Sequence, residues 1–159
     1  MASGTGTTAL FLANYFAERP VAPFSSFKSI EVVTVPCVGS ADYLKQQMLT
    51  LSNRTHGISG DTFPTILSTN KTPNRVFAKP NMDHLKIWQK LQRQSGIDFD
   101  LIYAPQTIEV LLSHCSTAAT AHDMSLKELY PEANIIYYHC GGVEGNISQL
   151  DRYKTMGLL

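Results

Sequence analysis

The chain has 159 residues, of which 43% are hydrophobic and 16% are charged, and thirteen basic residues balance thirteen acidic ones. This length allows one domain with a sizeable buried core. The zero net charge gives no basic footprint for nucleic acid or for an anionic membrane surface, so we expect no partner of either kind.

The three cysteines, Cys37, Cys115 and Cys140, have no CxxC spacing. An odd number of cysteines without such pairs indicates reduced thiols. The sequence also contains no signal peptide and no apolar run of transmembrane length. We therefore expect a cytoplasmic protein.

Helices and strands are predicted to alternate along the chain. Apolar spacing followed by prolines predicts a helix over residues 7–18, and a β-branched run predicts a strand over residues 29–36. The next predicted elements are a helix over 41–51, a strand over 63–68, a turn over 69–74 and an extended piece over 76–79.

The second half continues the alternation. Its predicted elements are a helix over 80–94 that ends at Gly96, a strand over 99–103, a helix from Pro105, a loop and helix over 116–129, a strand over 134–140, a loop over 143–146 and a helix over 148–154. The strands are too apolar for a sheet with one exposed face. We therefore expect a single α/β domain over residues 1–159 with a mainly parallel sheet.

The N-terminal loop is rich in glycine and hydroxyl groups, and it leads directly into the first helix. Its residues are Ser3, Gly4, Thr5, Gly6, Thr7 and Thr8. Such a loop at a helix start is typical of phosphate binding, because backbone N–H groups and the helix dipole face the anion. The motif requires a preceding strand, and here only Met1 and its neighbour are available. The alternative is a Ser/Thr-capped helix after a flexible terminus.

Two further loops follow predicted strands. They begin at Tyr103 and at His139, and the second contains Cys140, Gly141 and Gly142. Ligands of parallel sheets bind at the carboxyl ends of strands, so these loops are candidate binding segments. The alternative is that the glycine pair is only a turn.

Three motifs in this order carry a resemblance to a known family: Ala-Ser-Gly-Thr-Gly-Thr-Thr-Ala at 2–9, Phe-Asp-Leu-Ile-Tyr at 99–103 and Tyr-His-Cys-Gly-Gly at 138–142. Together they resemble the C-terminal half of the 1-aminocyclopropane-1-carboxylate deaminase / D-cysteine desulfhydrase family. The resemblance implies a pyridoxal 5'-phosphate (PLP) enzyme of the tryptophan synthase β-like fold type II, with three αβα layers. It also implies a small amino-acid substrate and a homodimer in the complete enzyme.

The resemblance gives roles to individual residues. Ser3, Gly4, Thr5, Gly6, Thr7 and Thr8 would hold the cofactor phosphate. Tyr103 would be catalytic beside the substrate, and Cys140 and Gly141 would lie near the ring. Ala104 departs from the family, which has a glutamate or threonine facing the pyridine nitrogen, and Cys140 replaces a threonine.

The family's Schiff-base lysine belongs to its N-terminal half, in a Gly-Asn-Lys setting. Asn70-Lys71 follows the phosphate loop in this chain, and we interpret it as a surface turn. We therefore expect the chain to be a C-terminal part whose partner is a missing N-terminal half, and to have little or no activity alone.

Three other interpretations remain open at this stage. The chain could be a non-catalytic module for phosphorylated ligands, or a half that complements a separate polypeptide. It could also be a dinucleotide-binding domain, which requires a strand before the glycines and an acidic residue such as Glu31 at the ribose. Glu144 is either a general base or a solvated loop residue. The histidines and cysteines lack metal-binding spacings, so we expect no metal.

Overall fold

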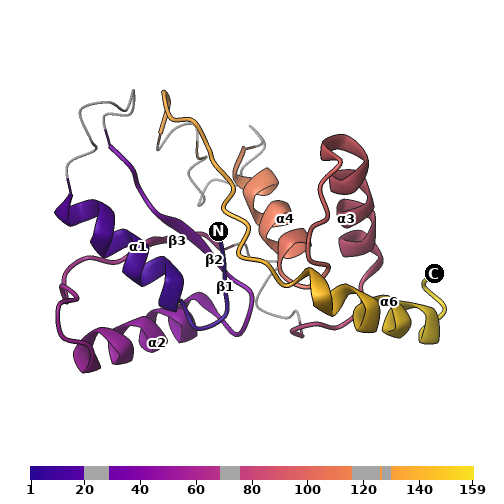
Figure 1. Ribbon diagram of the computed structural model, residues 1–159, viewed down its shortest axis with the longest axis horizontal. Coiled ribbons are helices and arrows are strands. Elements are labelled where there is room, and N and C mark those ends of the chain that lie inside the picture. Colours follow the sequence, from indigo (N-terminus) through magenta and orange to yellow (C-terminus); the bar gives the residue numbers. More distant parts are fainter. Residues whose placement is uncertain (20–28, 69–75, 116–125, 127–129) are drawn as a thin grey trace. The chain divides into compact units, whose positions relative to one another are not determined.

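The computed structural model describes residues 1–19, 29–68, 76–115, 126 and 130–159. The chain forms two compact units, Met1–Pro73 and Asn74–Leu159. Strands and helices occur together in the first unit and helices dominate the second (Figure 1), so the predicted α/β class is confirmed. The single domain over residues 1–159 stays a prediction. No helix in the described ranges is both long enough and apolar enough to cross a membrane.

The first unit is built on a three-stranded sheet in the order β1-β2-β3. The strands are β1 (Ala2–Ser3), β2 (Val33–Pro36) and β3 (Thr65–Ile66). Both pairings are parallel, with Ala2 opposite Val35 and Val33 opposite Thr65. The predicted strands over 29–36 and 63–68 are therefore confirmed, although each is shorter than expected.

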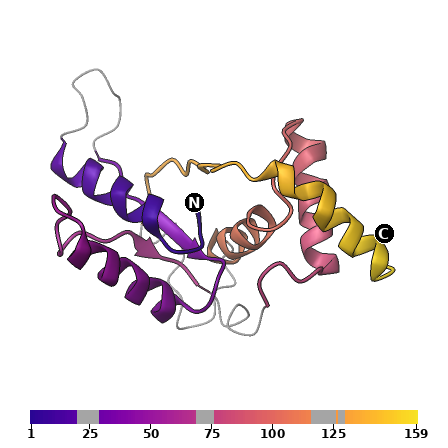
Figure 2. The same ribbon diagram turned by 60° about the horizontal axis from the view of Figure 1, so that its bottom comes forward.

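Two helices, α1 (Thr7–Glu18) and α2 (Ala41–Arg54), run side by side in this unit (Figure 2). Leu10 of α1 is fully buried against Leu44 and Met48 of α2, and Ile66 of β3 packs on the same cluster. This apolar cluster joins the two helices to the sheet.

The second unit consists of helices joined by extended segments. Its elements are α3 (Met82–Ser95), α4 (Ala104–Cys115), the 3-10 helix η1 (Val143–Gly145) and α6 (Asn146–Thr155). Its core comprises Leu85, Trp88, Phe99, Leu101, Ala104 and Tyr153. Trp88 is thus a core residue, as predicted. Lys86, Lys90 and Arg93 form the exposed face of α3, also as predicted.

Three predicted extended elements are not strands. Residues 76–79 contain a turn, residues 99–103 bend into α4, and residues 134–140 are extended but do not belong to the described sheet. Ile136 in the last segment is 72% exposed. A β-branched or aromatic run becomes a strand only where a neighbour pairs with its backbone, and the local pattern does not supply that neighbour.

Other boundaries also differ. Residues 143–146, predicted as a loop, form η1 and the first turn of α6, because α6 begins at Asn146. The predicted turn over 69–74 lies outside the described residues. So does the loop and helix predicted over 116–129, apart from Leu126.

Tyr153 connects α6 to the loop before α3. Its side chain is buried, and its hydroxyl accepts a hydrogen bond from the Asn81 N–H and donates one to the Asn81 carbonyl, both at 3.0 Å. Burial raises the pKa of the phenol above its ordinary value, and the hydrogen bond at Asn81 partly opposes this. A pKa higher in the folded state favours folding below the ordinary pKa of tyrosine, and this contribution is lost as the pH rises above it.

Replacement of Tyr153 by phenylalanine is expected to lower the free energy of unfolding by about 1–2 kcal/mol at neutral pH, because both hydrogen bonds are lost. The difference from the wild type should shrink above pH 10.0, the ordinary pKa of the phenol. Urea unfolding followed by Trp88 fluorescence at several pH values measures both effects. Parallel pH profiles for the two proteins would contradict the expected linkage.

Candidate functional site

The glycine-rich loop follows a strand after all. Ala2 and Ser3 form β1, which pairs in parallel with β2, so the expectation that no strand precedes the loop is wrong. Gly4, Thr5 and Gly6 then connect the carboxyl end of β1 to the first turn of α1. This is the strand–loop–helix arrangement that phosphate-binding loops require.

The hydroxyl groups of the loop divide into two sets. The Ser3 side chain is buried, and its Oγ lies 2.6 Å from Thr34 Oγ1 of β2, so this hydroxyl links two strands. Thr5, Thr7 and Thr8 are exposed, and the Oγ1 atoms of Thr5 and Thr7 are 3.0 Å apart. The three threonines are therefore the hydroxyls that an external anion can reach.

Gly6 makes the close approach of the loop to α2 possible. Its φ of 79° is in the left-handed region, and an added Cβ would lie 2.5 Å from Met48 Cγ and 3.0 Å from Leu44 Cδ1. The Gly6 carbonyl accepts the Leu10 N–H at 2.9 Å and so closes the first turn of α1. Glycine is needed here for both conformation and space.

The N-terminus of α1 has no side-chain cap, since Gly6 supplies no acceptor. The helices α2 and α3 differ, because Ser40 and Asn81 accept N–H groups of their first turns. The first N–H groups of an α-helix have no partner within the helix, and they carry the positive end of its dipole. The start of α1 can therefore bind an anion.

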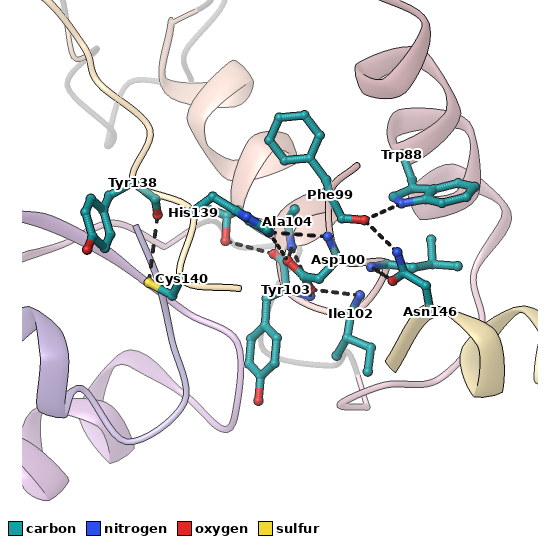
Figure 3. A network of polar contacts seen from close by, with 12 residues as sticks. Trp88, Phe99, Asp100, Ile102, Tyr103, Ala104, Tyr138, His139, Cys140 and Asn146 are labelled. Atoms are coloured by element: carbon teal, nitrogen blue, oxygen red, sulfur yellow. Dashed lines mark hydrogen bonds and ion pairs between the residues drawn. The ribbon is translucent and has the colours of Figure 1, made fainter. Parts of the chain in front are cut away.

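The second unit contains a buried polar centre at Asp100, shown in Figure 3. Asp100 is 2% exposed, and its carboxylate accepts the backbone N–H groups of Ile102 (3.1 Å), Tyr103 and Ala104 (3.2 Å). These groups precede or begin α4, so the carboxylate holds the start of this helix. Its role is positional, because its oxygens are already bonded to the backbone.

Side chains from α3 and α6 complete this centre. Asn146 Oδ1 accepts the Leu101 N–H at 2.7 Å, and its Nδ2 donates to the Phe99 carbonyl at 2.9 Å. Trp88 Nε1 donates to the same carbonyl at 2.7 Å. Side chains thus replace the ladder bonds that a strand over 99–103 would need. Asn146 is the first residue of α6, and its side chain binds the backbone of Phe99 and Leu101.

His139 joins the centre through Nε2, which lies 3.4 Å from Asp100 Oδ2 and 3.4 Å from the Asp100 amide nitrogen. A protonated Nε2 donates to the carboxylate, and an unprotonated one accepts the amide N–H. The ring also contacts Phe99 edge-on, with centroids 5.4 Å apart. His139 therefore has a partner at Asp100 in either tautomer, and it fixes residues 137–140 to the start of α4.

Tyr103 and Ala104 lie directly beside Asp100. The Tyr103 N–H is bound by the carboxylate, while its half-buried ring points away from it and packs against Phe77 at 5.4 Å between centroids (Figure 3). Ala104 is fully buried in the core as the first residue of α4. Position 104 therefore offers no polar side chain to a ring nitrogen.

Cys140 and the glycine pair follow His139. Gly141 and Gly142 have φ values of 92° and 96°, and Gly142 caps η1. The Cys140 side chain is exposed, and the pKa of its thiol is raised, chiefly by desolvation.

The two acidic candidates, Glu31 and Glu144, are placed in different units. Glu31 precedes the amino end of β2 and accepts the Thr65 hydroxyl at 2.7 Å. Glu31 therefore lies at the amino ends of β2 and β3. A ribose-binding carboxylate would have to lie at the carboxyl ends of the strands, where the glycine-rich loop begins. Although the strand before the glycines is present, Glu31 does not fit the dinucleotide interpretation. Glu144 is exposed on η1.

Sequence reasoning did not identify Asp100, the residue that organises the second unit. An aspartate shortly before a helix that contains an early proline is a recognisable capping signal. Comparison of the chain with protein-family models and with curated proteins gives no match. Function is therefore inferred from the geometry of the two units together with the motif resemblance.

Proposed function

We propose that the loop from Gly4 to Thr8 binds the phosphate group of PLP, in a protein related to the 1-aminocyclopropane-1-carboxylate deaminase / D-cysteine desulfhydrase family. The observation that carries this proposal is the uncapped start of α1 directly after β1. Backbone N–H groups there, together with the exposed hydroxyls of Thr5 and Thr7, can donate to phosphate oxygens.

PLP supplies an electron sink for reactions at the α-carbon of amino acids. In a deaminase or lyase of this kind, Tyr103 would lie beside a small amino-acid substrate, and Asp100 would position Tyr103 through its backbone N–H. The phosphate end of the cofactor fits the residues present. The pyridine end fits less well, because Ala104 is apolar and fully buried.

Calorimetric titration of the full chain tests phosphate recognition. PLP is expected to bind, inorganic phosphate to compete, and pyridoxal without phosphate to bind far more weakly. Replacing Thr5, Thr7 and Thr8 together by alanine should weaken PLP binding at least about tenfold, because each donor to a charged group contributes 1 kcal/mol or more. The control is Thr50→Ala on the exposed face of α2, where the threonine hydroxyl bonds Gln46 O within the helix.

Equal affinities for PLP and pyridoxal would contradict the proposal. So would a triple variant with wild-type affinity. A triple variant that unfolds would show this in its circular dichroism spectrum, and competition by inorganic phosphate on the wild type would then decide the question.

The apolar character of Ala104 favours a second candidate, a non-catalytic module that holds a phosphorylated ligand. Borohydride reduction after incubation with PLP separates the two functions. A reduced, lysine-linked cofactor detected by intact mass would support the enzyme. Phosphate-dependent binding without a covalent product would support the module.

A further inference from the structure

A cavity of about 230 Å³ lies within the second unit, lined by the loop before α3 and by residues of α3, α4 and α6. Its polar lining includes Lys79, His84 and Gln106, and its apolar lining includes Val76, Leu101 and Ile102. The volume is below the roughly 300–1,000 Å³ of sites for drug-sized ligands, so only a small molecule would fit.

The loop on one side of this cavity is held in a strained conformation. Ala78 has a φ of 55°, in the left-handed region. Among the described residues, every other residue in that region is a glycine. Gln149 of α6 is buried and donates to the Ala78 carbonyl at 3.0 Å, while Tyr153 binds both backbone groups of Asn81. Strain that surrounding contacts maintain is typical of preorganised binding sites.

Lys79 gives the cavity its positive charge. Within the described ranges its ammonium group makes no ion pair. Two other titratable groups belong to the lining: Tyr153, whose hydroxyl binds Asn81, and His84, which is buried and has Glu109 Oε2 at 3.3 Å from its Nε2. The histidine is thus balanced by a carboxylate and the lysine is not, so the cavity favours an anion.

The helix termini beside the cavity favour a singly charged ligand. Asn81 Oδ1 already accepts the N–H groups of Asp83 and His84 at the start of α3, and Asp100 occupies those at the start of α4. A phosphate dianion would find one lysine in the lining, and the starts of α3 and α4 are already occupied by Asn81 and Asp100. A carboxylate needs only the lysine, and a short hydrocarbon body matches Leu101 and Ile102.

We propose that this cavity binds a short-chain aliphatic carboxylate, with the Lys79 ammonium pairing its carboxylate group. This goes beyond the phosphate loop, which belongs to the first unit, and it does not depend on PLP binding. The cavity would then recognise a small carboxylic acid through one charge and an apolar wall.

Butyrate and 1-butanol, which have the same hydrocarbon body, are the probes. Titration of the ¹⁵N-labelled full chain with butyrate is expected to shift the amide resonances of Ala78, Lys79, Asn81 and the non-proline residues of 101–106 in a saturable way, and 1-butanol should not do so. Lys79→Met should weaken butyrate binding about threefold to fivefold, the upper range for an exposed ion pair, because Lys79 is exposed at the rim of the cavity. Lys79→Arg should retain binding, and Lys86→Met on the exposed face of α3 is the matched control.

Shifts that do not saturate, or that are equal for butyrate and 1-butanol, would overturn the proposal. Equal weakening by Lys79→Met and Lys86→Met would also overturn it, because the effect would then be one of general surface charge. Amide resonances of Gly4 to Thr8 report separately on the phosphate loop, so failure of one proposal is distinguishable from failure of the other.

Discussion

Replacement of Asp100 by alanine is expected to lower the free energy of unfolding of the second unit by about 2–4 kcal/mol. The buried carboxylate accepts N–H groups of Ile102, Tyr103 and Ala104, and it also faces His139. Alanine removes every one of these contacts and leaves the start of α4 without its cap. Trp88, the single tryptophan, lies in the same core and reports unfolding by fluorescence.

Asp100→Asn is the matched variant, because its amide oxygen can still accept backbone N–H groups although the charge is gone. It should recover at least half of the stability lost in the alanine variant. An asparagine variant as unstable as the alanine variant would indicate that the charge at His139 dominates. An alanine variant within about 0.5 kcal/mol of the wild type, the usual range of neutral surface changes, would refute the capping role.

Replacement of Gly6 by alanine is the second large effect, with an expected loss of about 2–4 kcal/mol in the first unit. Part of this is the cost of a left-handed conformation, about 1–2 kcal/mol for an L-residue. The rest comes from overpacking, since the new Cβ would overlap Met48 at 2.5 Å from its Cγ. Thermal unfolding followed by circular dichroism measures the loss.

Gly57→Ala separates the two contributions. Gly57 also belongs to the first unit and has a φ of 84°, but no atom lies within 4 Å of an added Cβ there. This variant should show only the conformational cost. If both variants lose the same stability, Met48 moves aside without cost and the close approach of the loop to α2 is not a packing constraint.

The helices could be predicted from the sequence because their signals are local. Apolar spacing, Ser40 before α2 and Gly96 after α3 each act within a few residues of a helix end, and the structure has helices at these places. The prediction of a strand over residues 99–103 was wrong because the deciding contact there is not local. Their aromatic and branched residues favour a strand, but the Asn146 side chain, 45 residues further along the chain, binds the Leu101 N–H.

The candidate loop was only partly predictable. Its glycines and threonines stand out in the sequence. The strand before it, β1, cannot be recognised there, because two residues are too few to show a pattern. The position of Ser3 in the sheet depends on its contact with Thr34, which is 31 residues away. Burial of Ala104 in the core likewise depends on α3 and α6, which the local sequence does not reveal.

The parallel pairing of β1 with β2 affects the order in which the first unit folds. Helices form quickly because their contacts are local, whereas Ser3 and Thr34, 31 positions apart, meet only after the segment between them closes. The start of α1 is fixed against β1 and α2 only when this closure is complete. The geometry of the loop therefore arises only with this long-range contact, and an anion that binds there is expected to slow unfolding rather than to speed the early steps of folding.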